Sequence, residues 1–407
     1  MTDENETKIT DQRSALAVFL VFLRLGLTSF GGPVAHLGYF HEEFVVRRQW
    51  LDERAYADLV ALCQFLPGPA SSQVGISVGL ARAGLPGAVA AWIGFTMPSA
   101  IALILFGYGV IEFGAAVTSG ALHGLKVVAV AVVAQAVWTM ARNLCPDTKR
   151  ATLAALTTIV VLAVPSPLTQ VGMIVVGGFV GWAMLRVDGP TDHVDLDIRV
   201  KKGTAITALV LFFAGLIMLP VFASVYPSQT MALVDSFYRA GSLVFGGGHV
   251  VLPLLQSEVV PPGWVSKDAF LAGYGAAQAV PGPLFTFAGF LGTVMTDTPN
   301  GVVGGIICLL AIFASSFLLV IGTVPFWDSL RRLDVVRNAL LGVNAVVVGL
   351  LLAALYDPVW TSAILSSADF GLALFAFTLL MFWKTPPWLV VILTGFGGWA
   401  LHTGLMV

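Results

Sequence analysis

The sequence predicts an all-α, polytopic membrane protein, and three observations lead to this prediction. Hydrophobic residues make up 57% of the 407 residues and charged residues only 11%, against roughly 25% charged residues in ordinary soluble domains. Apolar runs long enough to span a bilayer recur along the whole chain. Two of these runs are interrupted by the triplet Pro-Gly-Pro, at 67–69 and at 281–283. We therefore expect lipid to be the solvent of most of the surface.

About thirteen transmembrane helices are predicted, if each segment that contains the triplet crosses the membrane once. The expected spans lie near 15–33, 55–82, 85–109, 119–140, 151–165, 168–185, 204–222, 231–249, 268–295, 301–324, 339–356, 360–382 and 387–405. The run 151–165 is shorter than the ~20 residues that a spanning helix needs, so the pattern does not fix its ends.

Polar stretches divide the chain into four segments. These are a cytoplasmic tail 1–14, a first transmembrane repeat 15–186, a cytoplasmic linker 187–203 and a second transmembrane repeat 204–407. The tail is rich in acidic residues, unlike the start of a signal peptide, so we expect it to be retained.

The distribution of Lys and Arg predicts the orientation, because cytoplasmic loops collect these residues. With thirteen spans, fifteen of the basic residues outside the spans lie on the N-terminal side and three on the other. The N-terminus is therefore predicted to be cytoplasmic and the C-terminus extracytoplasmic, in the cell membrane. In the alternative arrangement each Pro-Gly-Pro segment is a re-entrant hairpin, and the split is a less uneven twelve to six.

The two halves share an ordered set of residues, which predicts an internal repeat. The aligned pairs are Arg24 with Arg239, Gly31 and Gly32 with Gly246 and Gly247, Glu43 with Glu258, Gln64 with Gln278, and the two triplets. Equivalent spans lie seven crossings apart, and because this number is odd the second half is expected to be inserted upside down. Inverted repeats around a central site are typical of secondary transporters.

The interrupted helices predict a binding site, because lipid does not tolerate unpaired backbone groups. The helix after each triplet is expected to point free N–H groups and its positive dipole end into a polar cavity. Small polar side chains nearby suit an oxyanion. The predicted binding residues are Gln64, Pro67, Gly68, Pro69, Ser71 and Ser72 in the first half, and Gln278, Pro281, Gly282, Pro283 and Thr286 in the second. The alternative is that the triplets only kink two helices for packing.

Three cations lie within apolar runs, where an arginine costs ~2.5–3.5 kcal/mol at the bilayer centre. We predict that Arg24, Arg239 and Lys126 bind the anion or pair with an internal carboxylate, unless the arginines reach an interface. Candidates for carrying a coupling proton are Glu43, Glu258, His36 and His249, and the alternative for each is a structural role. Gly31, Gly32, Gly246 and Gly247 are expected to permit a sharp turn or a close helix approach.

Several classes of function are disfavoured. The net charge of −2 and the lack of a basic run argue against nucleic acid as a partner. The three cysteines and six histidines are scattered without metal-ligand spacing, so neither a metal site nor a cofactor is predicted. No HExxH motif occurs, and an enzyme is therefore not expected.

Four stretches together resemble the chromate ion transporter family in its long, two-domain form. They read RLGLTSFGGPVAHLGYF and QFLPGP in the first half, and VFGGGHVVLPLL and AVPGP in the second. The resemblance extends from about residue 15 to residue 405. It implies gradient-driven export of chromate from the cytoplasm, and hence chromate resistance, with sulfate as a competitor.

Three questions stay open on the sequence alone. A sulfate-type uptake carrier and a passive anion channel are alternatives within transport. A proton is one candidate for the coupling ion, and a homodimer is one candidate for the assembly.

Overall fold

The computed structural model describes residues 14–113, 119–186, 198, 200–331 and 333–403. Most of the predicted tail 1–14 and of the predicted linker 187–203 lies outside these residues. Within them the regular elements are all helices and no strand occurs. Among the same residues, six helices are long and apolar enough to cross a membrane, and four further apolar helices are shorter. The protein is a multi-pass membrane protein, as its composition predicts.

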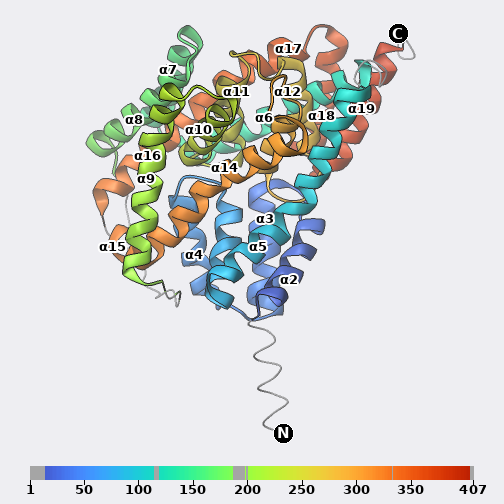
Figure 1. The fold of residues 1–407 in the computed structure, drawn as a ribbon. Coiled ribbons are helices and arrows are strands. Elements are labelled where there is room, and N and C mark those ends of the chain that lie inside the picture. The colour runs from blue at the N-terminus through green and yellow to red at the C-terminus, as the bar shows by residue number, and fades with distance from the viewer. Residues whose placement is uncertain (1–13, 114–118, 187–197, 199, 332, 404–407) are drawn as a thin grey trace.

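In Figure 1 the first part of the chain runs from the blue helices at the bottom to the green helices at the upper left. Their bounds are α2 Ala15–Thr28, α3 Gly32–His41 with a π-helical turn Glu42–Arg47, α4 Glu53–Phe65, α5 Ala70–Phe113, α6 Ser119–Leu144, α7 Thr148–Ala163 and α8 Pro167–Met184. The short run predicted at 151–165 thus begins three residues earlier, where Asp147 caps the helix by accepting the N–H of Arg150.

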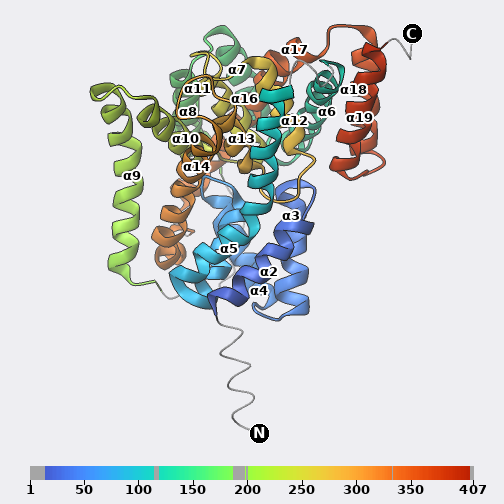
Figure 2. The ribbon, with the colours of Figure 1, turned by 45° about the vertical axis from the view of Figure 1, so that its right-hand side comes forward.

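The second part of the chain begins with α9, which stands at one edge of the molecule, opposite α18 and α19 (Figure 2). The bounds are α9 Lys202–Val225, α10 Gln229–Leu243, α11 Val251–Val259 after a 3₁₀ turn Gly248–Val250, α12 Lys267–Ala277, α13 Phe287–Thr293 after a 3₁₀ turn Leu284–Thr286, α14 Gly301–Thr323, α15 Trp327–Leu330, α16 Asp334–Ala354, α17 Thr361–Ala363, α18 Ser367–Met381 and α19 Pro387–His402.

Helix α5 is two helices joined by a sharp turn. Gly84 has φ +64 and interrupts the helical backbone, in a region that residues with a side chain rarely adopt. Gly79 and Gly87 face each other across the turn so closely that a Cβ on Gly79 would lie 2.3 Å from the Gly87 carbonyl oxygen. This turn falls at the boundary predicted between the spans 55–82 and 85–109.

The first Pro-Gly-Pro segment reverses the chain direction between α4 and α5. Cys63 Sγ and Ser77 Oγ are 14 residues apart in sequence but only 3.9 Å apart in space. A continuous helix would separate the two residues by about 21 Å. The two flanks of the triplet therefore lie side by side.

The second Pro-Gly-Pro segment reverses in the same way between α12 and α13. The rings of Phe270 and Phe287 are 5.1 Å apart, and a Cβ on Gly273 would lie 2.1 Å from the Phe290 ring. The prediction that each such segment crosses the membrane once is therefore wrong, and both are helical hairpins. The count of thirteen spans assumed that crossing. The orientation of the termini and the opposite insertion of the halves assumed it too, and they stay predictions.

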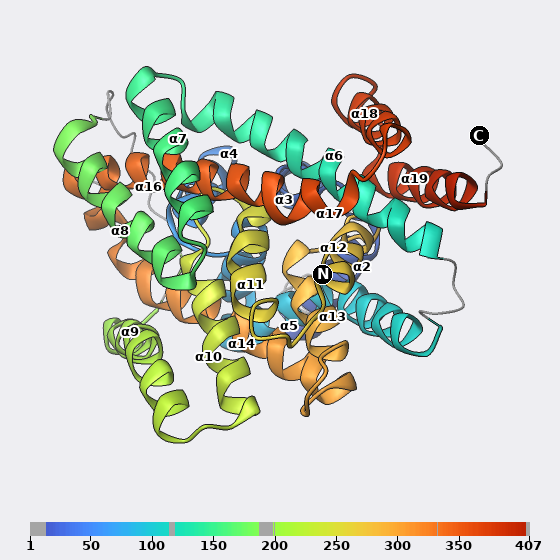
Figure 3. The same ribbon diagram turned by 90° about the horizontal axis from the view of Figure 1, so that it is seen from above.

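Each half contributes one long helix that packs against helices of the other half. Helix α6 of the first half packs on α18 and α19, and α16 of the second half packs on α7 and α8. Figure 3 shows α7 and α8 on one side of this arrangement and α18 and α19 on the other. Glycines permit both crossings, because a Cβ on Gly124 would lie 2.2 Å from the Thr394 carbonyl oxygen and one on Gly342 would lie 1.9 Å from that of Gly177.

A buried ion pair also joins the halves. Asp58 on α4 accepts a hydrogen bond from Arg331 Nη1 at 2.7 Å and one from Trp327 Nε1 at 3.1 Å. The Arg331 side chain is 6% exposed and that of Asp58 12%, and Arg331 also pairs with Asp328. The start of the first hairpin is thus fixed to α15 and to Arg331, the residue that follows it.

We expect Asp58→Asn to lower the free energy of unfolding by about 3–5 kcal/mol, because it leaves the Arg331 guanidinium buried with one partner fewer. Thermal unfolding in detergent measures the effect. A matched control is Asp334→Asn, which removes an exposed pair to Arg337 and is expected to cost at most about 1 kcal/mol. Equal unfolding temperatures for the two variants would contradict this assignment.

Candidate anion-binding site

The two Pro-Gly-Pro hairpins dock on each other's half through equivalent backbone hydrogen bonds. The N–H of Gly68 donates to the carbonyl of Val244 at 2.7 Å, and the N–H of Gly282 donates to the carbonyl of Ser29 at 2.9 Å. Ser29 and Val244 directly follow α2 and α10. Gly68 and Gly282 have φ +123 and +103, which side chains disfavour. The glycines of the triplets therefore permit the contact between the halves.

The paired glycines after α2 and α10 lie beside this contact. Gly31, Gly32, Gly246 and Gly247 all have positive φ, as a sharp turn requires. The ring of Pro33 lies 3.0 Å from where a Cβ on Gly248 would be. The two glycine motifs, far apart in sequence, thus meet in space.

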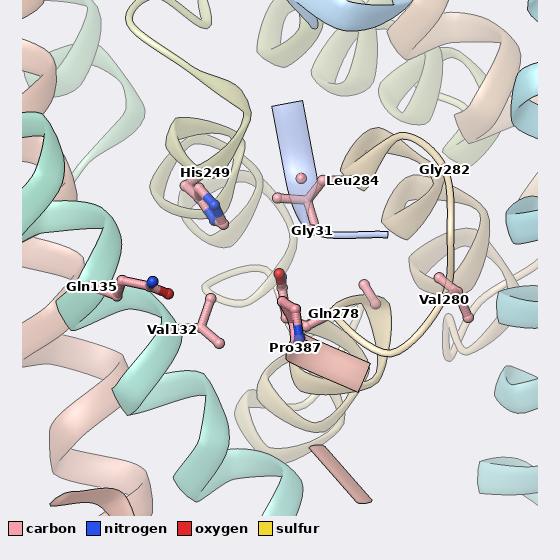
Figure 4. Close-up of a pocket in the computed structure, with 11 residues that line it drawn as sticks. Gly31, Val132, Gln135, His249, Gln278, Val280, Gly282, Leu284 and Pro387 are labelled. Atoms are coloured by element: carbon pink, nitrogen blue, oxygen red, sulfur yellow. The ribbon is translucent and has the colours of Figure 1, made fainter. Parts of the chain in front are cut away.

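A cavity of about 50 Å³ opens between the second hairpin, Gly31 and Gly32 of the first glycine motif, and His249 beside the second motif. This volume has room for a few water-sized groups. Figure 4 shows the side chains of Gln135, His249 and Gln278 around it. The lining residues are Gly31, Gly32, Val132, Gln135, His249, Ala277, Gln278, Val280, Gly282, Leu284 and Pro387. Both halves contribute, and none of these residues carries a carboxylate, an ammonium or a guanidinium group.

Hydrogen-bond donors around the cavity suit a small anion. Among the described residues, the side-chain amides of Gln135 and Gln278 make only long hydrogen bonds, of 3.4 Å, to backbone carbonyls, so these amides can turn toward a ligand. His249 Nδ1 shares a hydrogen bond of 2.8 Å with the Tyr274 hydroxyl. Its Nε2 lies 4.0 Å from where a Cβ on Gly32 would be, at the cavity wall.

Helix α3 adds a favourable dipole at the same place. It begins at Gly32 and its N-cap residue, Gly31, provides no side-chain cap. The first N–H groups of a helix have no partner within it and attract anions. Gly31 and Gly32 line the cavity, so the positive end of α3 faces it.

The first hairpin differs from the second because its own side chains fill it. Gln73 Nε2 donates to the Pro67 carbonyl at 2.7 Å, and Ser71 Oγ lies 3.3 Å from His36 Nδ1. Ser72 and His36 are buried, whereas Gln64 is exposed. In the second hairpin, Thr286 Oγ1 donates to the Pro283 carbonyl at 2.7 Å.

The predicted cations lie outside the cavity. Arg24 is exposed on α2. Lys126 pairs with Asp268 at 2.9 Å, and Arg239 pairs with Asp235 and Glu258. Of the predicted functional residues, the cavity brings together only Gly31, Gly32, His249, Gln278 and Gly282.

Glu43 also lies outside the cavity and pairs with two arginines, Arg47 at 3.0 Å and Arg48 at 2.6 Å. Sequence reasoning missed the other lining residues, which are Val132, Gln135, Ala277, Val280, Leu284 and Pro387. Gln135 had a usable signal, because it is the first polar residue after the apolar run 127–134.

Comparison with known proteins identifies the family. The sequence profile of the chromate transporter family matches residues 16–182 and again 231–399. The chain is 27% identical to the chromate transport protein of Pseudomonas aeruginosa over 417 aligned positions, which cover 98% of this chain and 95% of that protein. It is 25% identical to the chromate transport protein of Cupriavidus metallidurans, over 82% of this chain and 80% of that protein.

A relative of unassigned substrate is equally similar. An uncharacterized transporter of Methanocaldococcus jannaschii is 28% identical over 84% of this chain and 83% of its own length. No solved structure matches the chain. The profile covers both halves and most of the sequence, and the chain therefore belongs to the chromate transporter family.

Proposed function

We propose that the protein is a secondary active transporter that exports chromate from the cytoplasm and binds it in the cavity beside the second hairpin. Family membership supports the substrate, since relatives over most of this chain are named chromate transport proteins. The observation that carries the proposal is the cavity itself, which both halves line with uncharged hydrogen-bond donors. Such donors bind an oxyanion without the strong Coulomb attraction that hinders release.

The reciprocal hairpin contacts support an alternating-access mechanism. Equivalent backbone bonds join Gly68 to Val244 and Gly282 to Ser29, so the halves can exchange roles about their common contact. In this structure the second hairpin borders the cavity, whereas the Gln73 side chain occupies the space within the first hairpin. Transporters with repeats typically move one repeat against the other around a central site. We propose that the first hairpin opens when the second closes.

Sulfate is expected to compete with chromate. Both are tetrahedral dianions, and the cavity presents hydrogen-bond donors that recognise oxygen atoms rather than the central atom. Discrimination between the two anions by size alone is expected to be modest, as it is when substrates differ by one small group in a pocket.

Labelled chromate flux in proteoliposomes tests the function. The measurement follows chromate in both directions, with and without imposed pH and voltage gradients, and with sulfate as competitor. A carrier gives gradient-dependent flux that unlabelled chromate accelerates from the opposite side and sulfate inhibits. A flux that no gradient drives and no opposing anion accelerates would indicate a passive channel instead.

We expect Gln278→Leu to lower chromate flux about tenfold or more, because a hydrogen bond to a charged partner contributes about 1.5–3 kcal/mol. The same liposome assay measures it at equal protein incorporation. Gln256→Leu on α11, which does not line the cavity, removes the same amide elsewhere and is expected to retain flux. Equal flux in both variants would place the anion outside this cavity.

A further inference from the structure

A charged site lies between α10 and α11, apart from the central cavity. Arg239 Nη2 donates to Asp235 Oδ2 at 2.7 Å, and Arg239 Nη1 lies 3.0 Å from Glu258 Oε1. The hydroxyl of Ser236 also donates to Glu258, at 2.9 Å. The side chains of Asp235, Glu258 and Arg239 are 10%, 12% and 23% exposed. With both carboxylates ionised, this buried trio would carry a net charge of −1.

The helices packed around the trio supply no balancing charge among the described residues. Helices α8, α9, α14 and α16 pack on α10 and α11, and α8 and α14 contain no Asp, Glu, Lys, Arg or His. On α16, Asp334 and Arg337 pair with each other, and on α9 only the first residue, Lys202, is charged. An uncompensated charge that is buried costs several kcal/mol. The trio therefore favours a cationic partner.

A cavity of about 10 Å³ adjoins the trio and contains unpaired polar atoms. Gln170 on α8 is 4% exposed and lines this cavity. Its Nε2 donates to the Pro253 carbonyl at 3.3 Å. Among the described residues, however, its Oε1 accepts no hydrogen bond and Arg239 Nε–H finds no acceptor. About 10–15 Å³ holds one water. One water molecule here could accept a hydrogen bond from Arg239 Nε–H and donate hydrogen bonds to Gln170 Oε1 and the Glu258 carboxylate. The cavity is therefore suited to a small molecule that donates hydrogen bonds.

The equivalent place in the first half has the opposite charge balance. Glu43, the repeat counterpart of Glu258, pairs with both Arg47 and Arg48. Because that group has two cations for one carboxylate, no proton is required to neutralise the carboxylate. The two halves thus differ in electrostatics at equivalent positions.

We propose that Asp235, Glu258 and Gln170 form a proton-binding site, in which one proton on a carboxylate or on a water in the small cavity neutralises the trio. The proton comes from water on one side of the membrane and returns to water on the other, so no bond other than O–H forms or breaks. This inference rests on the proposed chromate transport, because binding and release of the proton couple the pH gradient to the movement of the anion.

The test compares two fluxes of labelled chromate in proteoliposomes. One is net flux driven by a pH gradient, and the other is chromate–chromate exchange at equal pH on both sides. Asp235→Asn and Glu258→Gln neutralise the trio without a proton, so they are expected to lose the pH-driven flux and retain exchange. Asp235→Glu keeps the carboxylate and is expected to retain the pH-driven flux. Glu43→Gln is the matched control and is expected to retain both fluxes.

A milder variant keeps the test decisive if those substitutions disturb folding. Ser236→Ala removes only one hydrogen bond to the Glu258 carboxylate, so the proton is held more tightly and the midpoint of the flux–pH profile moves to higher pH. An unmoved profile, or pH-driven flux that persists in Asp235→Asn, would overturn the site. A sodium gradient that drives flux where a pH gradient does not would overturn the proton in favour of sodium. Absence of chromate flux in the unaltered protein would refute the proposed function instead.

Discussion

Gly282→Val is expected to abolish chromate transport while the protein still inserts in the membrane. Gly282 has φ +103, and a Cβ there would lie 2.8 Å from Ser99 Oγ and 3.1 Å from the Phe95 carbonyl oxygen. A β-branched residue at this φ costs about 1–3 kcal/mol even without a clash. The hairpin would have to move, which would break the Gly282 hydrogen bond to Ser29 and deform the cavity.

Gly263→Val separates this local effect from backbone strain in general. Gly263 also has positive φ, +79, but a Cβ there would meet nothing within 4 Å. We expect this variant to be somewhat less stable and still active. Flux per inserted molecule, measured for both variants, decides the matter, and normal flux in Gly282→Val would contradict the role of the hairpin contact.

Gly342→Ala is expected to destabilise the protein clearly, although it adds only one methyl group. A Cβ on Gly342 would lie 1.9 Å from the Gly177 carbonyl oxygen, which belongs to the backbone of α8 and cannot rotate away. Overpacking costs about 1–3 kcal/mol. Because α16 and α8 form a contact between the halves, we expect the unfolding temperature in detergent to fall.

Gly178→Ala is the matched control for this effect. It adds a methyl group in the same interface, on α8, where the nearest atom would be Val343 Cγ2 at 3.6 Å, an ordinary contact distance. We expect Gly178→Ala to cause no loss of stability. In Gly124→Ala the added methyl group would meet the Thr394 carbonyl oxygen, and we expect this variant to be destabilised as Gly342→Ala is. If all three variants unfold at the same temperature, close packing does not hold the halves together.

The sequence was sufficient to predict the helical membrane fold but not the path of the chain through it. Apolar runs identify the helices, and the turn at Gly84 falls where the polar break predicts it. Hydropathy cannot tell whether a chain continues or reverses after Pro-Gly-Pro. Here tertiary contacts decide, such as the packing of Phe270 on Phe287, and these join residues that no local pattern relates.

The candidate site was predictable in part. The repeat pointed to glycines and to Gln278, which do line the cavity. Cations were predicted there because an arginine in an apolar run needs a partner, and the sequence does not show which partner is near in space. For Arg239 a clue was present, since Asp235 lies four residues before it on one helix face.

Equilibrium binding of labelled chromate to the purified protein tests the proposed anion site most directly. The central claim is that the anion binds among uncharged donors in the cavity rather than at the embedded cations. We therefore expect Gln278→Leu to weaken chromate binding about tenfold or more and Arg24→Gln to leave it unchanged, with unlabelled sulfate displacing chromate from both proteins. Binding that is lost in Arg24→Gln and intact in Gln278→Leu would contradict the claim.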